Sequence, residues 1–121
     1  MKIMLDAGHY GKYNRSPAVL EYYESDFTWK LHLYLKEELE RYENIEVLTT
    51  RETQENDLEL TKRGTCSKGC DLFLSLHSNA VGRTVNEQVD YPVAMVLSED
   101  NQTVIDEISR DLGQLLAKAV E

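Results

Sequence analysis

Short apolar runs alternate along the chain with longer segments in which apolar residues recur every three or four positions. The short runs predict β-strands, and the longer segments predict helices with one apolar face. The predicted strands cover residues 2–6, 45–49, 72–76 and 89–97. The predicted helices cover residues 25–42, 58–68 and 103–120. The segments between them are rich in glycine and polar residues, which is typical of turns and loops.

The helical segments also predict which side chains are buried and where the helices begin. The first has an apolar stripe that we expect to face the core: Phe27, Leu31, Leu35 and Leu39, with Tyr34 alongside. Ser25 or Asp26 could cap its start, and His32, off the stripe, is expected in solvent. Asp57 could cap the second helix, which we expect to end near Gly69. The last helix has a predicted buried face: Val104, Ile108, Leu112, Leu115, Leu116 and Ala119.

This alternation of strands and helices predicts a single α/β domain over residues 1–121. We expect a three-layer sandwich, with a mostly parallel or mixed sheet between helices. Strand 2–6 should lie between strands 45–49 and 72–76, although the apolar character of 72–76 on both faces favours a central position. Pro92 assigns strand 89–97 to an edge or a bulge.

Composition excludes several classes of partner. The net charge is −9, from 13 basic and 22 acidic side chains, so nucleic acid is not an expected partner. No segment approaches the roughly 20 apolar residues of a membrane helix, and the N-terminus does not resemble a signal peptide. We therefore expect synthesis in the cytoplasm. Cys66 and Cys70 are expected to be reduced. We expect them to be two small buried apolar side chains rather than a thiolate metal pair.

Two of the three histidines follow strand-like runs. His9 follows the first predicted strand and His77 the third, and parallel neighbouring strands bring their carboxyl ends to one edge. Two converging imidazoles suit zinc, whose third ligand could be Glu21 or Glu24. We favour Glu24 because it opens a helix with a packed stripe. Hydrogen-bonded surface histidines, without a metal, remain an equal alternative on spacing alone.

Five motifs in order give the chain a resemblance to a known family. They are Asp6-Ala7-Gly8-His9, Glu24 at a helix start, Thr50-Arg51, Leu60-Thr61-Lys62-Arg63 and the run from Asp71 to Ala80. The chain resembles zinc-dependent N-acetylmuramoyl-L-alanine amidases of bacterial cell-wall hydrolases and phage endolysins. The likeness is clear over residues 2–80 and weaker over 89–121. It implies a phosphorylase/hydrolase-like three-layer sandwich.

The resemblance implies that His9, Glu24 and His77 are zinc ligands. It implies hydrolysis of the amide between N-acetylmuramic acid and L-alanine in peptidoglycan, by a protein that acts on the cell wall after secretion or lysis. A non-catalytic zinc- or peptidoglycan-binding module is the alternative function. Arg51 and Arg63 are expected to hold loops through hydrogen bonds and ion pairs.

The chain departs from the family at three places. Ala7 stands where the family has proline, and Cys66 and Cys70 stand where small residues are common. The family also has a further C-terminal strand with a glutamate that acts as general base, and Glu121, which ends a predicted helix, is not assigned that role. The resemblance therefore implies a domain that lacks its last strand and helix. The uncovered sheet edge of such a domain could support self-association.

Overall fold

The structure is a computed structural model that describes residues 1–78, 84, 88, 91–96 and 106–120. It divides into two compact units, Met1–Val85 and Asn86–Glu121, and each is described by itself. None of the helices among the described residues is both long and apolar enough to cross a membrane.

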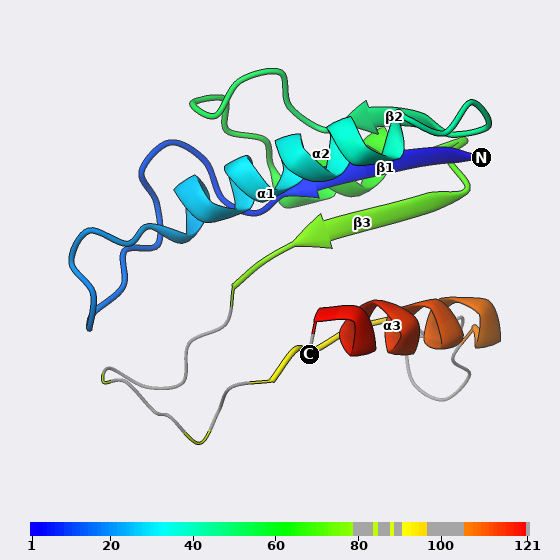
Figure 1. Cartoon of the computed structure of the whole chain (residues 1–121). Helices are drawn as coiled ribbons and strands as arrows, with labels where there is room; N and C mark the ends of the chain where they lie inside the picture. Colours follow the sequence, from blue (N-terminus) through cyan, green and yellow to red (C-terminus); the bar gives the residue numbers. More distant parts are fainter. Residues whose placement is uncertain (79–83, 85–87, 89–90, 97–105, 121) are drawn as a thin grey trace. The chain divides into compact units, whose positions relative to one another are not determined.

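The first unit contains a parallel three-stranded sheet. Its strands are β1 (Lys2–Ala7), β2 (Glu46–Thr49) and β3 (Leu72–Leu76), and their order is β2-β1-β3. All three point to the same edge (Figure 1), so the α/β prediction and the predicted position of the first strand are confirmed. The central position favoured for residues 72–76 is wrong in the described sheet, because β1 occupies it and is the more deeply buried strand.

The apolar core lies between this sheet and α1 (Glu24–Leu39), which contacts all three strands. Its buried centre is Ile3, Leu5 and Val47, and five partly buried residues pack against it: Leu35, Leu39, Ile45, Leu72 and Leu74. Burial of these side chains stabilises the sheet against the helix at about 25 cal/mol per Å² of apolar area. The carboxyl ends of β1 and β3 are thereby placed beside the first turns of α1.

The buried face of α1 differs from the predicted stripe. Leu35 and Leu39 pack against the core, but Phe27 and Leu31 are 42% and 37% exposed. The residues of α1 that are buried are polar: Glu24, Ser25, Thr28 and His32. The prediction of a solvated His32 is wrong, because the ring is 2% exposed and its Nδ1 lies 2.7 Å from the Trp29 carbonyl oxygen.

The helix starts also differ from the sequence prediction. Tyr23 precedes α1, and the Ser25 hydroxyl accepts a hydrogen bond from the Tyr13 N–H at 2.9 Å instead of capping the helix. The second helix, α2 (Leu60–Cys66), follows Glu59 and not Asp57. The prediction for α1 is wrong because Ser25 and Asp26 bind partners elsewhere in the fold, Tyr13 and Gln54.

Helix α2 is followed by the turn that the sequence predicts. Gly69 has a φ of +83°, a left-handed conformation that favours glycine after a helix. Cys66 and Cys70 are free thiols, as expected, but Cys66 is exposed and Cys70 only partly buried. The prediction that both are buried is wrong, because Cys66 is the last residue of a short helix and Cys70 lies in the connection to β3.

The second unit contains α3 (Glu107–Val120). Residues 91–96 of the predicted fourth strand form no strand, and residues 89, 90 and 97 lie outside the described residues. The Asp106 carboxylate accepts the Ser109 N–H at 2.8 Å, which caps the start of α3.

The predicted buried face of α3 is also corrected. Gly113 is buried, and a Cβ there would lie 3.1 Å from Val96 Cγ1, so the helix packs through a glycine against a neighbouring chain segment. Ile108 and Leu115 are 79% and 66% exposed, because the small residue and not the leucine stripe makes the close contact. Val104 lies outside the described residues.

Candidate metal centre

The ends of β1 and β3 bring two histidines together. Ala7 is opposite Leu76 in the parallel register, and the Gly8 N–H donates a hydrogen bond to the Leu76 carbonyl oxygen at 2.9 Å. His9 and His77 follow directly, and their ring centroids lie 5.2 Å apart at an interplanar angle of 81°. The predicted convergence of these two side chains is therefore confirmed, and it follows from the strand order.

The connection after β1 requires glycine and a strained histidine. A Cβ on Gly8 would lie 2.6 Å from both the Leu76 carbonyl oxygen and His77 Cε1. His9 has a φ of +59°, in the left-handed region that costs a residue with a side chain about 1–2 kcal/mol. Such a conformation persists where surrounding contacts determine it.

Glu24, the first residue of α1, completes a group of three possible metal ligands. It is 4% exposed, and its two carboxylate oxygens point to different histidines. Oε2 lies 3.1 Å from His9 Nε2, and Oε1 lies 3.1 Å from His77 Nδ1. One ligand atom from each of these residues lies within 4.8 Å of the other two. Glu21, the alternative from the sequence, is exposed and does not belong to the group.

These three residues fit a metal ion. Nitrogen and oxygen ligands bind zinc at 2.0–2.1 Å in a tetrahedral arrangement, which separates neighbouring ligand atoms by about 3.3 Å. Each histidine nitrogen lies 3.1 Å from one of the two oxygens of Glu24, close to that separation, and one ligand atom per residue lies within 4.8 Å of the others. The His77 side chain is 46% exposed and the His9 side chain 24%, so the group is open to solvent on one side. The arrangement could hold a cation and leave a position open for substrate.

Three further residues contact the carboxylate of Glu24 directly or through a partner. The side-chain amide of Asn14 donates to Oε2 and lies 3.4 Å from His9 Nε2. The Ser78 N–H donates to Oε1 at 2.8 Å, and the Tyr22 hydroxyl donates to the Ser78 hydroxyl at 2.8 Å. Asn14 lies in a segment that the sequence predicts only as a loop, and its φ of +55° is one that asparagine tolerates. Ser78 and Tyr22 carry no comparable signal.

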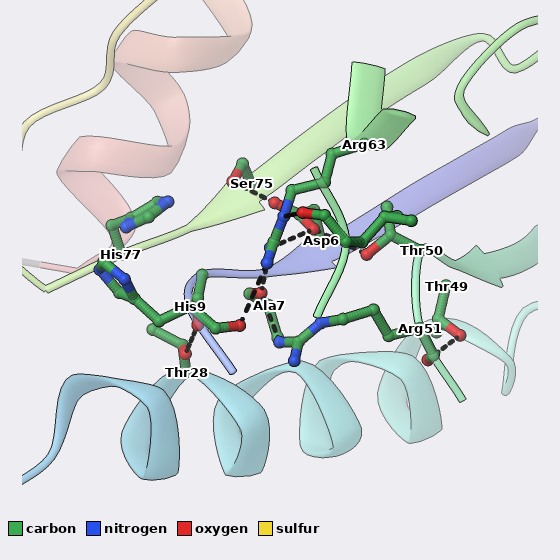
Figure 2. Close-up of polar contacts among 12 residues, drawn as sticks. Asp6, Ala7, His9, Thr28, Thr49, Thr50, Arg51, Arg63, Ser75 and His77 are labelled. Atoms are coloured by element: carbon green, nitrogen blue, oxygen red, sulfur yellow. Dashed lines mark hydrogen bonds and ion pairs between the residues drawn. The ribbon is translucent and has the colours of Figure 1, made fainter. Parts of the chain in front are cut away.

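A buried ion pair lies beside the connection that follows β1. Asp6 is 2% exposed, and its carboxylate accepts hydrogen bonds from Arg63 Nη1 at 3.0 Å, Thr50 Oγ1 at 2.6 Å and Ser75 Oγ at 2.7 Å. Figure 2 shows these side chains grouped around the end of β1. Since a buried carboxylate needs such partners, Asp6 ties β1 to α2, to β3 and to the segment after β2.

The two arginines hold the backbone next to His9. Arg51 Nη2 and Arg63 Nη1 donate to the Ala7 carbonyl oxygen at 2.7 and 2.9 Å, and Arg63 Nη2 donates to the His9 carbonyl oxygen at 3.3 Å. Burial and the nearby charge of Arg63 lower the pKa of Arg51. The predicted role of both arginines in holding loops is confirmed.

The sequence of the chain is similar to those of known proteins. The family model for N-acetylmuramoyl-L-alanine amidase matches residues 3–121. CwlM of Bacillus licheniformis, an N-acetylmuramoyl-L-alanine amidase, is 35% identical over 95 residues, which cover 76% of this chain and 37% of CwlM. The chain therefore spans well under half the length of that relative.

Two solved structures share the fold. The catalytic domain of CwlV, an N-acetylmuramoyl-L-alanine amidase from Bacillus (Paenibacillus) polymyxa var. colistinus, has a TM-score of 0.73 at 21% identity, over 97% of this chain and 60% of that one. The N-acetylmuramoyl-L-alanine amidase from Clostridium difficile 630 has a TM-score of 0.61 at 20% identity, over 84% of this chain and 54% of that one.

Proposed function

The chain belongs to the N-acetylmuramoyl-L-alanine amidase family, and on that premise we propose that it hydrolyses the amide bond between N-acetylmuramic acid and L-alanine in peptidoglycan. The observation that carries the proposal is the convergence of His9, Glu24 and His77 at the carboxyl edge of a parallel sheet. Ligands of α/β sheets bind at this edge. Its place of action is then the bacterial cell wall.

We propose that Zn²⁺ is the cofactor and that His9, Glu24 and His77 hold it. A His₂Glu set is a known catalytic zinc site that keeps one position open. When bound there, zinc would supply Lewis-acid polarisation of the scissile amide carbonyl. The chain's own contribution is to orient the ligands: Asn14 and the Ser78 N–H donate to the two oxygens of Glu24 and direct one toward each histidine.

A second function is binding of zinc or of peptidoglycan without turnover. One observation favours it: among the described residues, no further histidine, cysteine or carboxylate belongs to the group formed by His9, Glu24 and His77. A positioned general base contributes roughly 10²- to 10⁴-fold to the rate of such a reaction. A site with ligands and no base would therefore bind substrate more readily than it hydrolyses it.

Muropeptide hydrolysis tests the proposal. The protein, loaded with zinc, is incubated with a muropeptide that contains the N-acetylmuramoyl-L-alanine linkage, and release of the stem peptide is measured. We expect turnover that a chelator abolishes, that zinc restores, and that His77→Ala lacks. Turnover that survives both the chelator and His77→Ala would contradict the proposed site. Tight muropeptide binding with no turnover would support the second function instead.

A further inference from the structure

Thr28 links the helix that carries Glu24 to the strand end that carries His9. It lies one turn after Glu24 on the same face of α1, and its side chain is completely buried. Its hydroxyl lies 2.7 Å from the Gly8 carbonyl oxygen and 3.4 Å from the Ser25 carbonyl oxygen. A hydroxyl has a single proton to donate, and the shorter contact to Gly8 is the one that it serves.

The three residues Ala7, Gly8 and His9, here called the His9 turn, have every carbonyl group held by a side chain. Arg51 and Arg63 donate to Ala7. Arg63 donates to His9, and Thr28 donates to Gly8. Of these donors, Thr28 alone comes from α1. Figure 2 shows it approaching the turn from the helix below, while the arginines approach from other segments.

The contact from Thr28 matters because the His9 turn is strained and because His9 lies close to Glu24. The left-handed conformation of His9 depends on contacts that hold it. If the Gly8 carbonyl lost its donor, the turn could move relative to α1, and the 3.1 Å separation of His9 Nε2 from Glu24 Oε2 would change. The arginines would still hold the turn, Arg63 through its ion pair with Asp6 and Arg51 with its guanidinium over the Trp29 ring. The hydrogen bond from Thr28 is the one that joins the turn to α1 one helical turn from Glu24.

We propose that Thr28 is a positioning residue of the metal centre, whose hydroxyl sets the distance between His9 and Glu24 by holding the Gly8 carbonyl. This inference rests on the metal site of the proposed function. It predicts that the zinc affinity of the folded protein depends on the hydroxyl, beyond any effect on stability. Loss of a partner that orients a metal ligand typically weakens metal binding about 10- to 100-fold.

The experiment measures zinc affinity by competition with a chromophoric chelator. Thr28→Val keeps the shape of the side chain and removes the donor, and we expect the zinc Kd to rise about 10- to 100-fold. Thr28→Ser keeps the donor, and we expect a Kd close to that of the unsubstituted chain. Thr28→Ala is measured in parallel and serves the same comparison where Thr28→Val does not fold.

Val47→Ala is the matched stability control. Val47 is 7% exposed in the apolar core and contacts none of the three metal-site residues through a hydrogen bond or ion pair, so its loss should lower stability without changing zinc affinity. A folded Thr28→Val or Thr28→Ala protein with an unchanged Kd would overturn this inference and leave the metal site standing. Absence of zinc binding by the unsubstituted chain would overturn both.

Discussion

The two halves of α1 are held in place by different physics. In the first half, taken here as residues 24–32, the buried residues are polar: Glu24, Ser25, Thr28 and His32. In the second half, Leu35 and Leu39 pack against the apolar centre formed by Ile3, Leu5 and Val47. The first half also leaves Phe27 and Leu31 substantially exposed. Apolar burial is thus lower where the helix supplies Glu24 to the proposed metal site.

The polar half of α1 is held by individual hydrogen-bond partners, and the apolar half is held by the apolar surface area that it buries. Each buried polar side chain of the first half has a hydrogen-bond partner: Glu24 has Ser78, Ser25 has Tyr13, Thr28 has Gly8 and His32 has Trp29. Such bonds are directional, and loss of one leaves a buried group unsatisfied. Packing of leucines is tolerant of small shifts. Substitutions in the two halves should therefore separate metal binding from stability.

The largest effect is expected for Glu24→Gln. This change keeps the size of the side chain but removes the charge and one of the two oxygens that contact the histidines. We expect the zinc Kd to rise by more than about 100-fold, which exceeds the loss typical of an outer partner. Isothermal titration with zinc measures it. Glu21→Gln, at an exposed position outside the group, is the control, and equal effects of the two changes would contradict the site.

Gly8→Ala should weaken both zinc binding and the stability of the fold. The added methyl would lie 2.6 Å from the Leu76 carbonyl oxygen, so β1 and β3 would have to separate at the site. We expect a loss of about 1–3 kcal/mol in the free energy of unfolding, together with weaker zinc binding. Denaturant unfolding and zinc titration measure the two effects.

Gly64→Ala is the matched control for this change. Gly64 lies in α2 with no atom within 4 Å of an added Cβ, so alanine there should be neutral or stabilising by about 0.5–1 kcal/mol. If Gly8→Ala proved as benign as Gly64→Ala, the close contact between the two strand ends would be refuted.

Leu39→Ala, in the apolar half of α1, should lower stability and leave metal binding intact. Because Leu39 is partly buried against the core, we expect a loss of about 1–2 kcal/mol, below the range for a fully buried leucine. Zinc affinity of the folded protein should not change. Tyr34→Ala, at a residue 69% exposed, should cost little and serves as control. A large change in zinc Kd for Leu39→Ala would mean that the halves of α1 are not independent.

The smallest effect concerns pH. Burial lowers the pKa of His32 from its ordinary value of 6.5, so the native state binds fewer protons than the unfolded state in the window below that value. The contribution of His32 to stability is therefore complete above pH 6.5 and declines as pH falls below it. Unfolding of the unsubstituted chain and of His32→Gln between pH 7.5 and 5 measures the difference. An identical pH dependence of the two proteins would contradict the burial of this histidine.

Local sequence signals predicted much of the site but not its surroundings. The apolar runs predicted the three strands of the sheet and their order, because strand burial and right-handed crossovers restrict the arrangement. They also predicted a fourth strand, which residues 91–96 do not form. Glu24 was preferred to Glu21 because it opens a helix, and the structure places it beside both histidines. Asn14 was missed as a partner of Glu24, because a hydrogen bond across ten positions of irregular chain leaves no periodic pattern.

The three strands of the sheet, the approximate helices and the residues whose chemistry suits a metal could be predicted from the sequence, since each depends on local periodicity or on side-chain type. The packed fold decides which face of α1 is buried, because the connections after β1 and β3 offer hydrogen-bond partners to Thr28 and Glu24 there. It also decided that His32 is enclosed, and that Thr28 holds the carbonyl of Gly8. Burial and hydrogen bonding between segments distant in sequence depend on the packed fold, and no local pattern encodes them.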